Sequence, residues 1–510
     1  MLKCPHNYSK HHTGFIHDIL KLDNHFYDKH PQIIYLTIVL TSNMNKRSLI
    51  AVIVVVIIIG AVAATVAVSD FFSDEKEYII IDFDCSMARE NVERLIANGP
   101  RMAGSTAELK GAEYILSKYE EAGLENCNIE KYSVNLFDVR RAEVSLVEYG
   151  PMMMVPNPLV QPIVFEHIVD FVLQGYSGSY SWNDFRDDLL ISVIGNGSDP
   201  NTFSQANGDA CFIEYEEDGP GNPEIYKNAY DAGARAIILQ NLRGGEKIGY
   251  PPFFKTNQAY EDWGGQFPEI PFFMVSKEVG ETIKSQVSTS KLRLNFDVEK
   301  GPMDLCVTVG EIPGTSNSDD LYLIGGHHDT CYNTVGVVDN TAGPALICEL
   351  AAQMAKYKPK YTIRFCTFGG EEEGLYGSTA YFDAHKSELM GNVRLMSNFD
   401  MSHTDISRTN GFTVTTSINS SIKSLEKIRD KIVASTSELD KYSIRVLWDD
   451  GRWAGSDQWP FASHDIDVTN AWGGGCYEYH TYLDDLSHLN EESLQIGARI
   501  VGSYILNEAM

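Results

Sequence analysis

Two hydrophobic patterns organise this chain of 510 residues: one uninterrupted apolar run and a long region in which apolar and polar positions alternate. The run, residues 49–68, carries no charge and is long enough as a helix to cross a hydrocarbon core of about 30 Å. Because Lys46 and Arg47 precede it, the positive-inside rule places residues 1–48 in the cytoplasm and the rest of the chain outside. A cleaved signal peptide with a small-residue site at 61–63 is the alternative.

We therefore expect a membrane-anchored protein whose main part is extracellular, or a secreted protein if residues 49–68 are a cleaved signal. Residues 1–48 are then either a cytoplasmic tail or sequence upstream of the natural start.

Beyond the run, the periodicity changes several times. Between residues 85 and 122 apolar positions recur every three or four residues, which predicts helices, and Gly123 suits a C-cap. Strand-like runs complete a first part, residues 78–150. Residues 151–298 combine Gly/Pro-rich loops with strand–helix–strand patterns and predict a smaller inserted α/β domain. In residues 299–510 strands alternate with helices, which predicts a layered α/β domain with a mostly parallel sheet.

Composition excludes several classes of protein. The chain has 41 Lys and Arg against 70 Asp and Glu, a formal charge of −29, so a nucleic acid is a poor partner. At 43% hydrophobic and 22% charged residues, the chain is not disordered. The nine Cys form no CxxC pair, which argues against a Cys-rich zinc ribbon. A disulfide between Cys331 and Cys476 and two buried, reduced thiols remain equally open.

Several predicted strands end on residues that bind metals. In open α/β sheets ligands bind at the carboxyl ends of the strands, so distant segments can deliver side chains to one place. Histidine nitrogen mixed with carboxylate oxygen suits Zn²⁺, Co²⁺ or Mn²⁺. An isolated HHD or EEE is more often a core histidine or a solvated helix face, because a chain with 70 carboxylates contains such groups by chance. The candidates at strand ends or in nearby loops are His327, His328, Asp329, Asp339, Glu371, Glu372, Glu373, Asp400 and His480.

The order of these segments is more specific than any one of them. GGHHDT, VVDNTAG, GGEEEGLYGS, NFDM and YHTYLDD resemble, in this order, the motifs of a family of di-zinc exopeptidases. Its members include bacterial leucine aminopeptidases, aminopeptidase Y, carboxypeptidase Q and glutamate carboxypeptidase II. GPRMAGS at 99–105 and GSDQWPF at 455–461 are also similar to family motifs, although Gln458 stands where His is common. The segment 151–298 resembles a protease-associated (PA) domain.

The resemblance implies a three-layer α/β exopeptidase domain with a mostly parallel central sheet, a PA-like insert and one N-terminal transmembrane helix. It also implies two zinc ions per chain, with Co²⁺ or Mn²⁺ as possible replacements. Asp339 would bridge the ions, His327 and Asp400 would bind the first, and Glu372 and His480 would bind the second.

The same resemblance implies three catalytic roles. Glu371 would be the general base, and Asp329 would orient the imidazole of His327 by accepting its other N–H. With strand periodicity, His328 would point away from the side that His327 faces. Tyr479 would face the oxyanion, although a packing role for this ring stays open.

We expect a peptide substrate, and an aminopeptidase that hydrolyses N-terminal residues is the favoured function. A carboxypeptidase or dipeptidase is the first alternative, for which Arg452 is the candidate carboxylate ligand. A non-catalytic binding ectodomain is the second, and the presence of Glu371 argues against it. Three tryptophans near the pocket loop could line a hydrophobic subsite or pack in the interior: Trp448, Trp453 and Trp459. The oligomeric state is left open.

Overall fold

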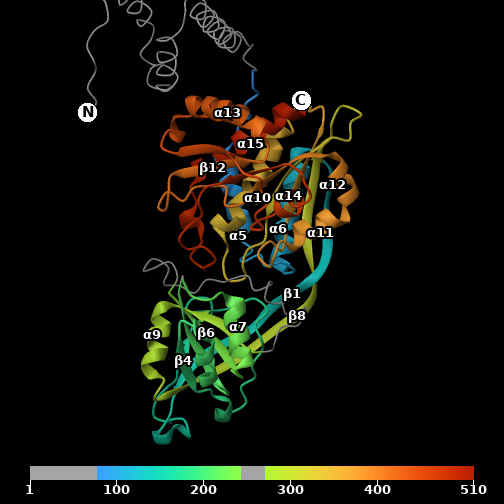
Figure 1. The fold of residues 1–510 in the computed structure, drawn as a ribbon. Helices are drawn as coiled ribbons and strands as arrows, with labels where there is room; N and C mark the ends of the chain where they lie inside the picture. The colour runs from blue at the N-terminus through green and yellow to red at the C-terminus, as the bar shows by residue number, and fades with distance from the viewer. Residues whose placement is uncertain (1–76, 217, 243–269) are drawn as a thin grey trace, which may run out of the picture. The chain divides into compact units, whose positions relative to one another are not determined.

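The computed structural model describes residues 77–216, 218–242 and 270–510 (Figure 1). Residues 78–510 form one compact unit. The apolar run at 49–68 and the tail at 1–48 lie outside the described residues. Within the described ranges, no helix combines the length and the apolar character needed to cross a bilayer.

A nine-stranded sheet forms the frame of the larger part, in the order β13-β12-β14-β11-β9-β10-β8-β1-β2. Its four central strands, from β14 to β10, are parallel. In chain order the strands are β1 (Glu125–Glu148), β2 (Ile163–Phe165), β8 (Ser290–Ile312), β9 (Leu321–His327), β10 (Thr362–Phe368), β11 (Val393–Phe399), β12 (Gly411–Thr416), β13 (Ser443–Trp448) and β14 (Val468–Trp472).

The prediction of a mostly parallel sheet is wrong, because the sheet is mixed. Outside the parallel centre, β12 pairs parallel with β13 but antiparallel with β14, and β8, β1 and β2 are joined by antiparallel pairing. Parallel neighbours need a crossover of about a dozen residues or more, usually a helix. Only residues 313–320 join β8 to β9, and no helix lies between β11 and β12, so the chain reverses direction at both places.

Helices cover both faces of this sheet. Alternate residues of β9 enter different cores: Tyr322 and Ile324 lie in the core under α10 and α15, whereas Leu321 and Leu323 lie in the core under α11 and α12. The expected three layers are therefore present. The helices are α5 (Cys85–Ile96), α6 (Thr106–Ala122), α10 (Ala342–Met354), α11 (Tyr376–Ala384), α12 (Lys386–Asn392), α13 (Ile422–Ser435), α14 (Trp459–Ala462) and α15 (Leu494–Ala509).

The region 85–122, predicted to be helical, forms two helices, and a side chain caps the N-terminus of each. The Asp84 carboxylate accepts the N–H groups of Ser86 and Met87 at the start of α5, and the Ser105 hydroxyl accepts the N–H of Glu108 in α6. Gly123 ends α6 in the left-handed conformation at φ 81°, as predicted, because glycine adopts this conformation without a Cβ clash.

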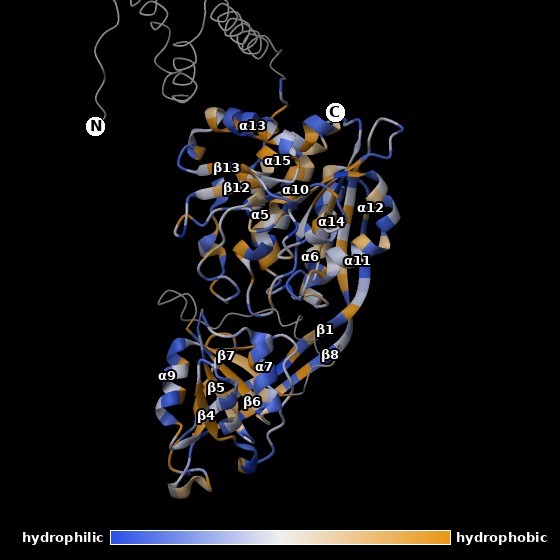
Figure 2. Ribbon diagram, viewed as in Figure 1, coloured by the Kyte–Doolittle hydropathy of each residue, from blue (hydrophilic) through white to orange (hydrophobic). Residues whose placement is uncertain are grey.

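A second sheet of five strands lies within residues 171–275, in the order β3-β7-β6-β5-β4. Figure 2 shows hydrophobic residues on its strands and hydrophilic residues on α9. The boundary predicted between residues 298 and 299 falls inside β8, whose long ribbon with β1 runs into this part (Figure 1). The elements are β3 (Phe171–Leu173), β4 (Ile191–Gly195), β5 (Ala210–Tyr215), α7 (Asn222–Asp231), β6 (Ala236–Asn241), β7 (Phe272–Val275) and α9 (Lys277–Gln286).

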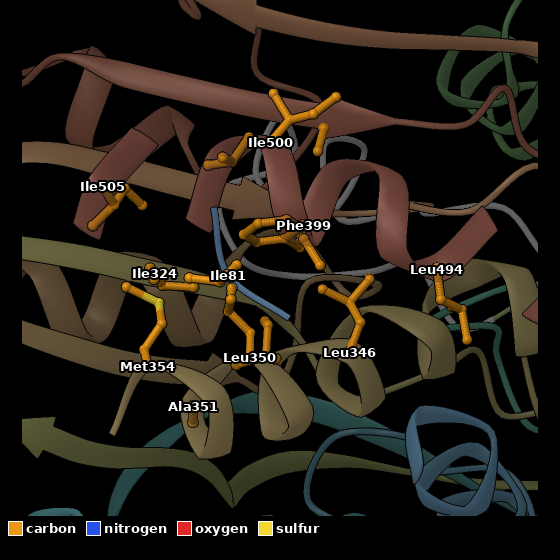
Figure 3. Close-up of a cluster of buried hydrophobic side chains, with 14 of the residues drawn as sticks. Ile81, Ile324, Leu346, Leu350, Ala351, Met354, Phe399, Leu494, Ile500 and Ile505 are labelled. Atoms are coloured by element: carbon orange, nitrogen blue, oxygen red, sulfur yellow. The ribbon is translucent and has the colours of Figure 1, made fainter. Parts of the chain in front are cut away.

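The main core lies between the nine-stranded sheet and α10, which is buried along nearly all of its length. Figure 3 shows Leu346, Leu350 and Met354 of α10 among apolar side chains of β9, β11 and α15. A Cβ built on Gly502 of α15 would lie 2.5 Å from Leu350 Cδ1 and 2.7 Å from Ile81 Cδ1. The two helices therefore pack without room for one extra methyl group, as expected of a close-packed interior.

Leu350→Ala should destabilise this core, because Leu350 is fully buried and its neighbours are too tightly packed to fill the cavity. The expected loss is about 2–5 kcal/mol, seen as a lower midpoint in differential scanning calorimetry. Leu447→Ala, at a side chain that is 44% exposed, is the control and should leave the midpoint nearly unchanged. An equal shift in both variants would contradict this account of the core.

Candidate metal centre

Three neighbouring parallel strands deliver the candidate residues to one edge of the large sheet. β9 ends at His327, β10 is followed by Glu371 and Glu372, and β11 is followed by Asp400. Because β9 pairs parallel with both β10 and β11, the carboxyl ends of all three strands meet at the same edge.

The structure brings together all five predicted metal ligands. His327 Nε2 lies 3.2 Å from Asp339 Oδ1 and 3.4 Å from Asp400 Oδ1. His480 Nε2 lies 3.2 Å from Asp339 Oδ2 and 3.1 Å from Glu372 Oε2. The two oxygens of Asp339 thus face two different histidines, which is the arrangement needed for a carboxylate between two ions.

Asp329 lies directly behind this cluster. Its Oδ1 is 3.3 Å from His327 Nδ1, and its two oxygens accept the backbone N–H groups of Glu371 and Glu372 at 3.3 and 3.1 Å. One buried carboxylate therefore orients the imidazole and also fixes the backbone that carries two glutamates. His328 points to the other side, with Nδ1 3.1 Å from Thr367 Oγ1, as strand periodicity predicts.

The loop that carries Asp339 is held from two sides. Asp484 accepts the backbone N–H groups of Val338 and Asp339 at 2.8 and 3.0 Å, and burial raises the pKa of Asp484 to about 7. Asn340 Nδ2 donates to the carbonyl oxygens of His327 and Phe399 at 3.2 and 2.9 Å. Sequence reasoning assigned no role to Asp484 or Asn340, although both lie inside the quoted motifs.

Arg101 is a third residue that sequence reasoning missed, although it lies in the GPRMAGS segment. Its side chain is fully buried, with Nε donating to the His328 carbonyl oxygen at 2.8 Å and a terminal N–H donating to Thr341 Oγ1 at 2.5 Å. Burial lowers the pKa of Arg101 to about 10, against the attraction of Asp329. Arg101 thus connects the end of β9 to the loop that precedes α10.

The buried carboxylates of this region need cations to compensate their negative charge. Burying a carboxylate costs free energy unless it is paired or coordinates a metal. Burial alone would lower the pKa of His327, but the Asp400 and Glu371 carboxylates outweigh it and raise that pKa well above its usual value. Burial also raises the pKa of Asp457 to about 7. The acidic residues that are buried or nearly buried here are Asp329, Asp339, Glu371, Glu372, Glu373, Asp400 and Asp457.

The donor set fits zinc. The ligand atoms of His327, Asp339 and Glu372 all lie within 4.8 Å of one another, and all three residues are buried. Zinc is bound in proteins by His nitrogen and carboxylate oxygen, which are the donors that these three residues offer.

A cavity of about 430 Å³ opens beside Asp400 and Tyr479. The Tyr479 ring stacks on His480 with 3.7 Å between centroids, and burial together with Asp339 raises the pKa of Tyr479 well above its usual value. Of the three tryptophans singled out in the sequence, Trp453 lines the cavity, and Trp472, which was not singled out, lines it as well. Neither Lys nor Arg occurs among the described residues that line it.

The remaining sequence candidates lie elsewhere. Trp448 is 56% exposed, and neither it nor Trp459 is among the residues that line the cavity. Arg452 is outside the lining and forms an ion pair with Asp465. The eight cysteines of the described residues are all free thiols, so Cys331 and Cys476 form no disulfide.

Comparisons with known proteins find one matching family model and several relatives. Residues 308–505 match the family model of Peptidase family M28. The chain is 26% identical over 415 residues to aminopeptidase YwaD of Bacillus subtilis, covering 79% of this chain and 80% of that protein. It is 23% identical over 479 residues to a probable glutamate carboxypeptidase of Arabidopsis thaliana, covering 77% of this chain and 66% of that protein.

The fold has a solved counterpart. The structure of BSAP, a zinc aminopeptidase from Bacillus subtilis, matches with a TM-score of 0.65 at 21% identity and covers 84% of this chain and 96% of that one. The chain therefore has the mixed α/β fold of that enzyme.

Asp329→Asn should weaken zinc binding without unfolding the protein. The amide retains one acceptor oxygen but presents N–H groups where the carboxylate accepts from His327 and the backbone. We expect zinc affinity, measured by competition with a chelator, to fall about 10–100-fold. Asp465→Asn, at a side chain that is 82% exposed, is the control. Unchanged affinity in Asp329→Asn would show that Asp329 does not position the site.

Proposed function

Because residues 308–505 belong to peptidase family M28, we propose that this protein is a zinc-dependent aminopeptidase that hydrolyses the first peptide bond of peptides with a free N-terminus. The observation that carries the proposal is the position of Asp339, whose two oxygens each face a different histidine beside buried acidic residues. This arrangement supports a metal centre, for which a fold used only for binding would have no need.

The ligand geometry supports two zinc ions. His327 and Asp400 would hold the first, Glu372 and His480 the second, and Asp339 would lie between them. When bound, zinc supplies Lewis-acid polarisation of the scissile carbonyl and lowers the pKa of a coordinated water toward 7.

Glu371 is the general base of the proposed reaction. It is buried, with 3% of its surface exposed, and its backbone N–H is fixed by Asp329. Its carboxylate would take a proton from the attacking water and pass it to the leaving amine. Tyr479 lines the cavity next to His480, so its hydroxyl can donate to the developing oxyanion.

The cavity favours an amine over a carboxylate at the substrate end. Asp400 and Asp449 line it, and its described lining has no basic residue. A carboxypeptidase needs a cation for the terminal carboxylate, and Arg452 pairs with Asp465 outside this cavity. The aminopeptidase is therefore the better supported function, although the chain also resembles a carboxypeptidase in sequence.

Two further parts of the proposal concern the rest of the chain. We propose that residues 151–298 are a PA-like domain, which is supported by a five-stranded sheet accompanied by α7 and α9.

We also propose that residues 49–68 anchor the protein in a membrane with the catalytic part outside the cell. This proposal is supported by the uncharged run and by Lys46 and Arg47 before it.

Glu371→Gln should abolish turnover while zinc stays bound, because the amide cannot accept the proton of the attacking water. With leucine p-nitroanilide we expect kcat to fall by about 10²–10⁴-fold, with unchanged zinc content by elemental analysis. Glu373→Gln, two residues away and also buried, should retain most of the activity. If Glu373→Gln loses activity and Glu371→Gln does not, the general base is Glu373. Cleavage of N-blocked peptides from the C-terminus would refute the aminopeptidase assignment.

The cavity also predicts which first residues are accepted. Trp453 and Trp472 offer apolar surface, and the carboxylate of Asp449 repels an acidic side chain. In a panel of aminoacyl p-nitroanilides, kcat/KM for Phe and Leu should exceed that for Glu at least about tenfold. Trp453→Ala should lower kcat/KM for Phe more than for Ala, whereas Trp448→Ala should not. If Trp453→Ala lowers kcat/KM equally for the Phe and the Ala substrate, Trp453 does not contact the first side chain of the substrate.

A further inference from the structure

Cys331 lies at the metal centre but has no part in the mechanism above. It follows His327 by four residues, is fully buried and is a free thiol. Its Sγ and the ligand atoms of Glu372 and His480 all lie within 4.8 Å of one another. Two residues close to this thiol are thus the pair assigned to the second ion.

The three donors come from different parts of the chain. Cys331 lies in the loop after β9, Glu372 follows β10, and His480 lies before α15. In a tetrahedral zinc site, with Zn–S of about 2.3 Å and Zn–N of about 2.0–2.1 Å, ligand atoms lie about 3.5 Å from one another. The measured 3.1 Å between His480 Nε2 and Glu372 Oε2, together with the 4.8 Å limit for all three atoms, is compatible with one ion among them.

Cys331 belongs to an apolar cluster, but unlike other buried thiols it also lies beside ligand atoms of the metal centre. Cys211, also fully buried, lies in the apolar core of the second sheet, where burial is the sole cause of its raised pKa. Cys331 instead lies beside two side chains assigned to the metal centre, Glu372 and His480, and all three residues are buried. A metal that coordinates sulfur removes the thiol proton outright.

We propose that Cys331 is a sulfur ligand of the second metal ion, which makes that position a mixed S/N/O site selective for thiophilic cations. On binding, the S–H bond is replaced by a sulfur–metal bond and the thiol proton leaves to solvent. Sulfur favours Zn²⁺ and Cd²⁺ over Mn²⁺, which prefers carboxylate, carbonyl and water oxygen. The sequence indicated only nitrogen and oxygen donors, so this inference changes the expected metal preference and rests on the proposed function.

The test uses cobalt as a spectroscopic probe in the whole protein, with metal content measured independently. Wild-type protein with two Co²⁺ bound should show a sulfur-to-cobalt charge-transfer band in the near ultraviolet. The band should persist in Cys211→Ser and disappear in Cys331→Ser. In competition titrations we compare the ratio of Cd²⁺ affinity to Mn²⁺ affinity at each of the two sites. At one site this ratio should be at least about tenfold lower in Cys331→Ser than in the wild type. Absence of the band in the wild type with both ions bound would overturn the inference.

Cadmium NMR of the wild-type protein keeps the proposal testable if Cys331→Ser does not fold. We expect two cadmium resonances, one of them shifted far downfield by its sulfur ligand. If both resonances lie in the range typical of cadmium bound only by nitrogen and oxygen, the inference is wrong. Failure of the proposed function is a separate result. Wild type that cleaves leucine p-nitroanilide when loaded with zinc but shows no band when loaded with cobalt refutes only the role of Cys331. A band in the cobalt-loaded protein without peptidase activity in the zinc-loaded protein refutes only the function.

Discussion

The rest of the site depends on one electrostatic constraint: a single buried carboxylate, that of Asp339, must face two histidines at once. His327 and His480 approach its two oxygens at 3.2 Å each. Holding the carboxylate there requires a fixed backbone, which Asp484 provides by accepting the N–H groups of Val338 and Asp339. Because several further carboxylates are buried nearby, the arrangement is favourable only when cations compensate their charge.

The fold supplies this arrangement through the parallel centre of the large sheet. β9, β10 and β11 end side by side, so residues far apart in sequence lie within ion-binding distance of one another. Asp329 adds to the rigidity, because the same side chain contacts His327 and the backbone of both glutamates. A metal-binding residue and the proposed base are therefore positioned by a common anchor, as expected where a small error in geometry has a large effect on rate.

The second sheet also contacts the site. Tyr332, which follows Cys331, donates its hydroxyl to the Leu173 carbonyl oxygen at 3.0 Å and stacks with His167 at 5.8 Å between centroids. Cys331 itself belongs to the apolar cluster that includes strands of the insert and the ends of β1 and β8. The loop that carries the thiol therefore packs against residues of the second sheet as well.

Sequence alone determined which side chains could form the site, because the ordered motifs around His327, Asp339, Glu371, Asp400 and His480 keep their chemistry and spacing. It also determined the C-cap of α6 at Gly123 and the opposite orientation of His328, since both follow from local backbone geometry. The direction of the outer strands, the free state of the cysteines and the places of Arg101, Trp472 and Cys331 at the site were decided only by the tertiary structure. Each of these depends on contacts between segments far apart in the chain, and periodicity reports which face a residue occupies but not which distant residue it meets.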